Sequence, residues 1–314
     1  MVDIGKPPPD DRWRVAASDD PAVPPLLALG VAVLAISTSA ILVRWSDAPN
    51  VVKALYRVSF TVGALAPLAV RRGEWRRGAI GRRDGLVAVT AGVLLAVHFA
   101  AWFESLDHTS VAASVTLVQA QPVFVVAGAW LLLGERVTRR SLVGIGVALV
   151  GMAWLSVGPA LAGSVALAGT TYGNALALLG AVAAAGYVLT GRSLRQRLAV
   201  LPYVTVVYTA CAVVLLVVAL ARGTVLLAYP PHEWVLFVAM ALGPGVLGHT
   251  VVNWALGHVE SHVVSVSLLG EPVGSTALAV LLLSEVPTAG TLGGGAIVLA
   301  GIYVTASARR GIDA

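Results

Sequence analysis

The sequence feature that most constrains the fold is an internal repeat with an offset of 150 residues. Gln121-Pro122 precedes Glu135 by the same spacing with which Glu271-Pro272 precedes Glu285. A shared excess of apolar residues does not explain why a proline, a glutamate, a threonine and two glycines match in one register. The chain therefore contains two copies of one unit. Further residues of the first copy that meet an identical residue 150 positions later are Ala127, Ala129, Leu131, Leu132, Leu133, Thr138, Leu142, Gly144, Leu149 and Gly151.

Composition places both copies in a lipid bilayer. The 314 residues are 58% hydrophobic and 12% charged, with a mean hydropathy of +0.86, which leaves too little polar surface for a soluble globule. The apolar runs have the length that a helix needs to cross a membrane, and aromatic residues are too sparse for outer-membrane barrel strands. We predict an all-α inner-membrane protein with ten transmembrane helices. The predicted spans are 24–43, 50–70, 86–105, 109–132, 141–157, 172–191, 201–221, 234–253, 262–283 and 289–307.

The positions of Lys and Arg predict the orientation of the chain. Seventeen of the 21 lie in the two tails and in alternate loops, so the positive-inside rule predicts that both termini are cytoplasmic. Each copy contributes five spans, an odd number, so the second copy must enter the membrane from the opposite side. Gly30 and Gly180, at the same offset, extend the repeat to the start of each copy. The predicted architecture is two inverted five-helix repeats.

These patterns divide the chain into five parts. Residues 1–22 carry prolines and aspartates but no apolar signal region, and we expect a disordered cytoplasmic tail. The first repeat covers 24–157, an uncharged extracytoplasmic connector covers 158–171, the second repeat covers 172–307 and a short tail covers 308–314. The net charge of +5 reflects membrane orientation and does not indicate nucleic-acid binding. Cys211 is the only cysteine, which excludes a disulfide framework.

Pro122 and Pro272 lie near the middle of the fourth and ninth spans. A proline inside a helix frees the carbonyl four residues earlier, here on Val118 and Leu268. A kink that serves packing alone is one interpretation. Symmetric placement in both halves favours a transporter in which the prolines act as hinges and the two halves rock around a site at mid-membrane.

A polar side chain precedes each proline. Gln121 stands in one copy and Glu271 in the other, with Gln119 two positions before Gln121. A carboxyl at mid-membrane is costly unless it is protonated, paired or hydrated. Glu271 is therefore a candidate for binding substrate or a coupling proton, and the alternative is a neutral acid that hydrogen-bonds between helices.

Two basic residues begin the second span. Lys53 and Arg57 are four residues apart and share one face of the predicted helix. We expect Lys53 to extend to the outer surface. Arg57 lies deeper, where it needs Glu271, a backbone carbonyl or an anionic group of the substrate.

Further polar residues of the spans could line a cavity. His98 and His249 nearly correspond in the two copies, and Ser37 meets Tyr187 at the offset of 150. Helix-to-helix hydrogen bonds are the alternative for these residues, and the aromatic belt at the membrane surface is the alternative for tryptophan. The remaining cavity candidates are Trp102 and Asn253.

Other motifs argue against catalysis. Glu104, Asp107 and His108 on an outer loop are too few and too mixed to predict a metal site. We find no nucleotide fingerprint or catalytic triad, and we expect no cofactor and no enzymatic activity. Glycines seven residues apart in the fifth and tenth spans predict close helix packing, either within the chain or in a homodimer. Glu135 and Glu285 are expected to act as caps or loop anchors.

Several short motifs of the two copies occur together in one known family. They are Arg44-Trp45-Ser46-Asp47-Ala48-Pro49, Tyr56-Arg57, Gln121-Pro122, Leu131-Leu132-Leu133-Gly134-Glu135-Arg136, Glu271-Pro272 and Ser284-Glu285. With these motifs the chain resembles the drug/metabolite transporter superfamily, in particular its EamA-like exporters. The resemblance covers residues 24–307. It implies a basket-like bundle in which spans one to four and six to nine surround a cavity while spans five and ten pack outside. It also implies export by alternating access without ATP hydrolysis.

The sequence therefore predicts a secondary transporter. We expect it to export a small polar or amphipathic metabolite, such as an amino acid, with protons as candidate coupling ions. The alternatives are efflux of drugs or cationic compounds and, from another class, a membrane sensor or lipid-handling protein that does not transport. Convergence of His98, Gln121, His249 and Glu271 on one hollow would favour transport.

Overall fold

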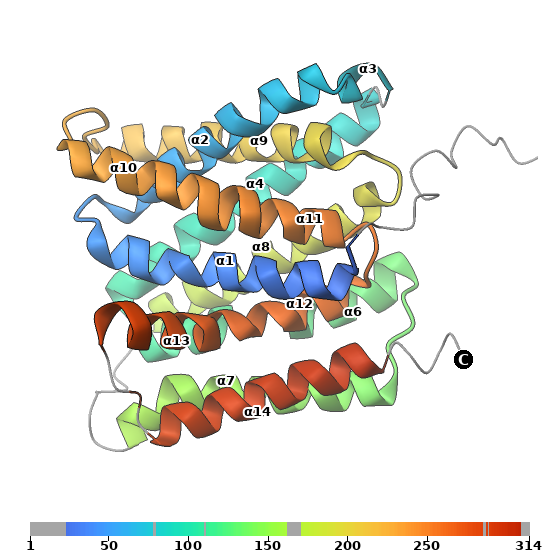
Figure 1. Ribbon diagram of the computed structural model, residues 1–314, viewed down its shortest axis with the longest axis vertical. Helices are drawn as coiled ribbons and strands as arrows, with labels where there is room; N and C mark the ends of the chain where they lie inside the picture. Colours follow the sequence, from blue (N-terminus) through green and yellow to red (C-terminus); the bar gives the residue numbers. More distant parts are fainter. Residues whose placement is uncertain are drawn as a thin grey trace, which may run out of the picture.

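The computed structural model describes residues 23–77, 80–109, 111–161, 171–284, 287 and 289–308. In this part of the chain all regular elements are helical, and they form one bundle of roughly aligned helices (Figure 1). The predicted tails at 1–22 and 308–314, except Ala308, lie outside the described residues, as does most of the 158–171 connector. Residues 158–161 are helical, because the preceding helix continues to Leu161.

The helix bounds follow the predicted apolar runs closely. The first half contains α1 (Pro25–Trp45), α2 (Asn50–Arg71), α3 (Glu74–Arg77), α4 (Arg82–His108), α5 (Val111–Val118), α6 (Gln121–Leu133) and α7 (Arg139–Leu161). The second half contains α8 (Thr171–Arg195), α9 (Val200–Ala221), α10 (Pro231–Met240), the π-helix η2 (Ala241–Thr250), α11 (Val251–Ala255), α12 (Ser261–Ser267), the 3₁₀ turn η3 (Leu268–Gly270), α13 (Glu271–Leu283) and α14 (Ala289–Ser307).

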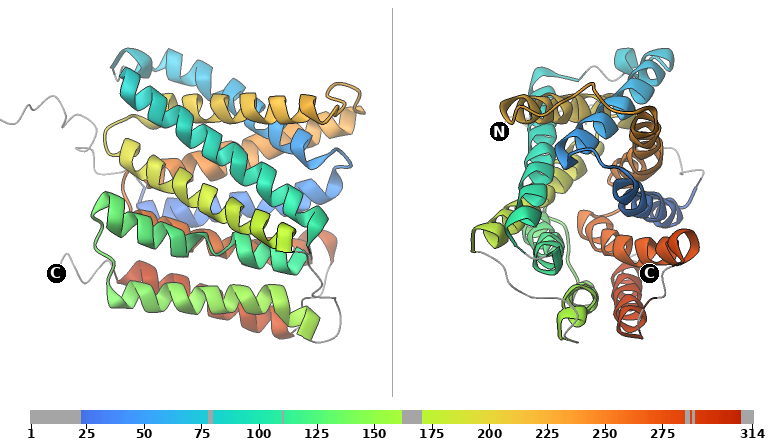
Figure 2. Two further views of the ribbon diagram at one scale, coloured as in Figure 1. Left: turned by 180° about the vertical axis from the view of Figure 1, so that it is seen from behind. Right: turned by 90° about the vertical axis from the view of Figure 1, so that its left-hand side faces the viewer.

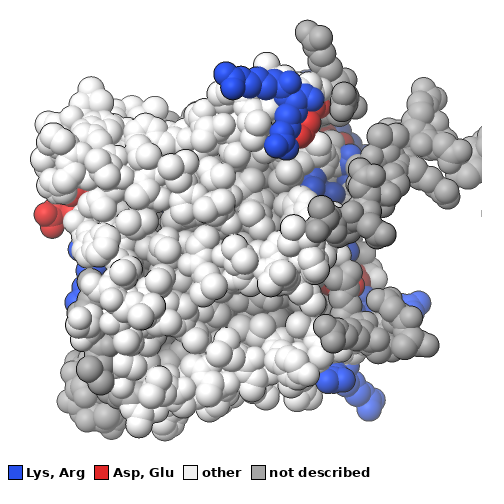
Figure 3. Space-filling view, viewed as in Figure 1, with Lys and Arg blue, Asp and Glu red and all other residues white. Residues whose placement is uncertain are grey.

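The molecule is a multi-pass membrane protein. Eight helical segments of the described chain are long and apolar enough to span a membrane, and α5 with α6, together with α7, complete the ten predicted segments. Large apolar side chains face outward, among them Leu132 and Leu281, each 76% exposed. Such side chains need lipid around them. Figure 3 shows a white belt between the two ends, with most visible Lys and Arg at the end where α1 begins and α14 finishes.

The two halves run in opposite directions. α1 begins at the end of the bundle where α14 finishes, whereas α8 begins at the other end (Figures 1 and 2). This arrangement is the inversion that an odd number of spans per copy requires.

The halves interleave and do not form separate lobes. α1 packs against η2 and α13, α2 against α9, α4 against α8 and α9, and α7 against α14. Each of these contacts joins one half to the other. Rocking of one intact half against its partner, as the sequence suggested, would break all of them.

The packing of α7 on α14 explains the glycine spacing. A Cβ atom on Gly151 would lie 2.7 Å from the backbone nitrogen of Val298, and one on Gly301 would lie 2.3 Å from that of Ala148. Only hydrogen at these positions lets the two backbones approach so closely. The glycine seam therefore lies within the chain, at one edge of the bundle (Figure 1).

Both proline-containing spans are interrupted, not merely kinked. α6 begins at Gln121 and α13 at Glu271, so each proline is the second residue of a new helix, where its missing N–H costs nothing. The Leu268 carbonyl accepts a hydrogen bond from the Glu271 N–H. The expectation that this carbonyl is free was therefore wrong, because the chain tightens into a 3₁₀ turn.

Candidate functional site: a polar centre around Arg57

Arg57 lies among Ser39, His98, His249 and Glu271, and we call these five residues the polar centre. It lies on α2, its guanidinium donates to the Ser39 hydroxyl at 3.4 Å, and it lies over the Phe99 ring at 5.3 Å from the centroid. Its charge is close enough to interact with Glu271, His98 and His249. Glu271 is not paired directly with it, because no ion pair joins these two among the described residues.

A small cavity lies beside Arg57. Its volume is about 10 Å³, close to what a single water molecule requires. An amino acid does not fit into this space, so binding one would require the surrounding helices to separate. The cavity is lined by Arg57, Val58, Thr61, Leu95, Phe99, Tyr208, Gly245 and His249.

Glu271 is the first residue of α13, in the interior of its span. Its side chain is partly buried, and its backbone carbonyl accepts a hydrogen bond from Ser37 at 3.0 Å. Ser37 is itself fully buried and also donates to Val33. It therefore fastens α1 to the start of α13 and does not line the cavity beside Arg57. The interrupted helix directs the positive end of its dipole toward the carboxyl group.

The two histidines take different positions. His98 bonds through Nδ1 to the Gly180 carbonyl at 2.9 Å, so Nδ1 carries the proton and Nε2 is left to accept. The structure therefore supports the helix-to-helix interpretation for one of its nitrogens. His249 lines the cavity beside Arg57. Trp102 stacks on His98, and its buried indole N–H has no hydrogen-bond partner among the described residues.

Asn253 and Tyr187 belong to one buried network. The Asn253 amide nitrogen lies 2.5 Å from the Tyr187 hydroxyl, 3.1 Å from the Tyr208 hydroxyl and 2.8 Å from the His249 carbonyl, and its two N–H groups are shared among these three acceptors. Tyr208 also lines the cavity, so the network extends the polar centre toward the end of α11.

The two glutamines, Gln119 and Gln121, differ from the other candidate residues in their surroundings. Gln121 is buried at the start of α6, and Gln119 lies, partly exposed, in the turn before it. Arg57, His98, His249 and Glu271 therefore lie near one another, while no hydrogen bond or ion pair in the described chain joins Gln119 or Gln121 to them.

Comparison with known proteins identifies the family. A family model described as the EamA-like transporter family matches residues 24–157 and 171–307. This chain belongs to the EamA-like transporter family. It is accordingly a membrane transporter of the drug/metabolite transporter superfamily and not an enzyme.

The fold of this EamA-like transporter is also found among solved structures. One crystal structure shares 22% identity, with a TM-score of 0.75, and the alignment covers 92% of this chain and 99% of the other. In total, 29 chains of solved structures match. No curated protein matches the sequence.

The sequence analysis of this transporter missed Tyr208 and Tyr203. They are the two tyrosines of the largely apolar α9, and Tyr203 is fully buried. The repeat could have found them, because Tyr203 corresponds to Lys53 and Tyr208 to Val58, next to Arg57, at the offset of 150.

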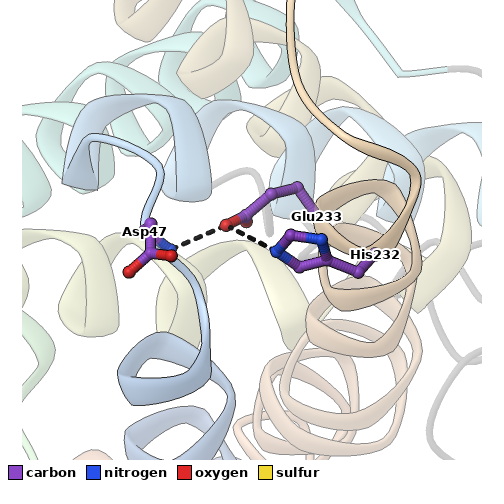
Figure 4. Close-up of side chains that lie close together, drawn as sticks. All are labelled: Asp47, His232 and Glu233. Atoms are coloured by element: carbon purple, nitrogen blue, oxygen red, sulfur yellow. Dashed lines mark hydrogen bonds and ion pairs between the residues drawn. The ribbon is translucent and has the colours of Figure 1, made fainter.

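A second polar cluster closes the opposite end of the bundle from the chain termini (Figure 4). Glu233 accepts from the Ser46 hydroxyl at 2.5 Å and from the Asp47 N–H at 2.7 Å, and His232 lies 3.6 Å away. Although three side chains here could ligate a metal ion, both Glu233 oxygens already have donors. The cluster therefore holds the turn between α1 and α2 against the start of α10.

The position of Lys53 differs from the prediction that its side chain extends to the outer surface. Its side chain is buried and donates to the Val43 carbonyl at 3.1 Å, so it does not extend to the surface. The nearby charges of Glu233 and Asp47 offset part of the cost of burying its ammonium group.

Glu135 anchors α12 as a cap, as expected. Its carboxylate accepts from the Ser261 N–H and hydroxyl, the latter at 2.8 Å, and from Arg192 at 2.8 Å. Burial alone would raise the pKa of Glu135, but hydrogen bonds from His262 and Ser261 and the charge of Arg192 outweigh it and lower the pKa to about 2. Glu285 lies outside the described residues.

Proposed function

We propose that this EamA-like transporter exports a small amphipathic zwitterion, most simply an amino acid, by secondary active alternating access. The observation that carries the proposal is the placement of Arg57 and Glu271 as two separate ionisable side chains in one polar centre. Arg57 would bind the carboxylate of the substrate and Glu271 its ammonium group. The same carboxyl group could load a coupling proton when the substrate leaves.

The remaining candidates would shape the site. His249 and Tyr208 line the cavity, His98 offers Nε2, and Trp102 offers its unpartnered indole N–H. Asn253 and Tyr187 hold the lining in place, and Gln119 and Gln121 would reach the substrate only after the helices separate. Pro122 and Pro272 are proposed as the points at which the interrupted spans bend.

We also propose the orientation. The clustering of Lys and Arg at the end that carries both described termini supports a cytoplasmic location for that end, in the inner membrane of the cell. A homodimer stays a prediction, because the glycine seam that suggested one is used within the chain.

Flux into proteoliposomes tests the proposal. Purified protein would be assayed with a panel of amino acids, with and without a pH gradient, beside the variants Glu271→Ala and Arg57→Ala. Both variants should lose most flux, whereas Glu104→Gln, which removes a surface ion pair with Arg222, should retain it. Undiminished flux in Glu271→Ala would reject the role of that carboxyl.

A parallel arm addresses efflux of cationic compounds. Because Arg57 places a positive charge in the centre, a purely cationic compound should be transported poorly. Transport of lipophilic cations but of no amino acid on the panel would replace the proposed substrate class by that of drug efflux.

A further inference from the structure

Three buried polar atoms without partners lie near the ends of α8, α9 and α11. They are the Arg195 Nη1, the Tyr203 hydroxyl and the Asn253 Oδ1, and none has a hydrogen-bond partner among the described residues. Tyr203 and Asn253 are fully buried, and Arg195 is 8% exposed. Leaving such groups unpartnered is costly, so each of them needs an explanation.

Gly191 shows where these groups converge. A Cβ atom on this residue of α8 would lie 3.1 Å from the Tyr203 hydroxyl and 3.6 Å from the Asn253 Oδ1. The Arg195 Nε donates to the Asn253 carbonyl at 3.0 Å, and its charge is close enough to interact with Tyr203. The atom nearest to such a Cβ is the Leu256 Cδ1 at 2.9 Å, the end of a flexible side chain, so a group beside Gly191 reaches the unpartnered polar atoms when this methyl group shifts.

The chemistry of these atoms selects the ligand. The guanidinium can only donate, the amide oxygen can only accept, and the tyrosine hydroxyl can do both. A metal cation would be repelled by Arg195, and an anion would meet the amide oxygen. Water donates and accepts, and buried waters in proteins typically bond to about three polar groups.

We propose that one or two water molecules bind beside Gly191 and hydrate a polar path from the cytoplasmic end of the bundle to the central cavity. The path runs from Arg195 past Tyr203 to Asn253, which bonds to Tyr208 on the cavity wall. At its outer mouth Glu74 of α3, whose Oε2 is buried and unpartnered, is close enough to interact with Arg195.

The path would also affect how the substrate enters from the cytoplasm, and this inference rests on the proposed function. Arg195 attracts carboxylates and disfavours protons and other cations, as arginines in membrane pores do. Asn253 lies on α11 and the other residues on α3, α8 and α9, so the hydrated groups lie at a seam between packed helices. When the helices separate at this seam, the cytoplasmic side opens. The polar groups there are already hydrated, so they do not lose direct hydrogen bonds to one another.

Hydroxyl-radical footprinting tests the water site directly. X-ray pulses generate radicals from water next to side chains, and mass spectrometry measures the modification of Tyr203 against the exposed Tyr172. Buried Tyr203 should be modified at a rate comparable with Tyr172. Gly191→Ala, whose Cβ enters the site, should lower this rate severalfold, while Gly63→Ala, whose Cβ meets nothing within 4 Å, should leave it unchanged.

Two outcomes overturn the proposal: an unmodified Tyr203 in the wild-type protein, or equal modification in Gly191→Ala. If Gly191→Ala does not fold, Tyr203→Phe decides the matter. Removing a hydroxyl that binds water lowers the melting temperature, whereas removing an unpartnered hydroxyl raises it.

Measurements of flux distinguish the water site from the path to the cavity and from the proposed function. Gly191→Ala should slow amino-acid flux severalfold relative to Gly63→Ala, and equal flux in the two variants would overturn the path to the cavity. Absence of flux in the wild-type protein, with Tyr203 still modified, would reject the proposed function and leave the water site standing.

Discussion

Single residues carry the charges on which the site depends, and the sequence located the most important of them. Glu271 and Arg57 stand out as charges within apolar runs, because burying a charge is too costly to occur by chance. Their partners could not be predicted in the same way. Ser37 bonds to backbone carbonyls, and Lys53 folds back onto Val43, because local packing decides such contacts.

Replacement of Glu135 should weaken the end of the molecule at which both described termini lie. Glu135→Gln removes the charge that holds Ser261 and Arg192, at a cost on the order of 1–3 kcal/mol. Because the folded pKa is lowered from 4.5 to about 2, the stabilisation is complete above about pH 4.5 and is lost as the pH falls toward 2. Thermal unfolding of both proteins across this range measures the difference.

The exposed pair of Glu104 and Arg222 supplies the control, since surface ion pairs contribute about 0–1 kcal/mol. Glu104→Gln should therefore unfold close to the wild-type temperature. If the difference in melting temperature between Glu135→Gln and wild type grew below pH 4.5, the stabilising role of the ionised Glu135 would be contradicted.

At the scale of elements, apolar runs predicted helix positions to within a few residues, because bilayer thickness fixes helix length. The interruptions were harder to predict. A proline marks a disturbance, but whether the helix kinks or restarts depends on how the preceding turn satisfies its carbonyls. In this chain the Leu268 carbonyl accepts from Glu271 in η3, and the Leu117 carbonyl accepts from Ala120 in the turn before α6. Glu271 and Gln121 are the first residues of the helices that follow.

Pro272→Ala should join α12 to α13 more continuously. Alanine restores an N–H and favours the helix, so folding should be preserved or improved. Glu271 would shift relative to Arg57, and amino-acid flux should fall roughly tenfold or more, since small misplacements of site groups are costly. Melting temperature and flux are measured on the same preparation, and unchanged flux would show that the interruption is dispensable.

The glycine seam allows a matched pair of variants on α14. Gly301→Ala places a Cβ against the backbone of Ala148, whereas a Cβ on Gly293 meets nothing within 4 Å. Gly301→Ala should lose about 1–3 kcal/mol of stability by overpacking, and Gly293→Ala should be nearly neutral. Equal melting temperatures would mean that α7 and α14 do not pack so closely.

For the whole molecule, the repeat predicted inversion but not interleaving, since an offset between copies does not tell which helices touch. The contacts define two groups of helices, each drawn from both halves. The first group contains α1, α10, η2, α11, α12 and α13, and the second contains α2, α4, α5, α6, α8 and α9. Glu135 links the groups at one end by holding Ser261. Alternating access would then be motion of these groups against each other.

Distances between spin labels on the two groups test this account most directly. With Cys211 replaced by alanine, one pair would be placed at Asp47 and Asp107 and another at Arg136 and His258, at opposite ends of the bundle. We predict two populations in which one distance is long when the other is short, and Glu135→Gln should favour a long distance between 136 and 258. A single unchanged distance for both pairs, or a joint lengthening of both, would contradict a centre that opens alternately to the two sides.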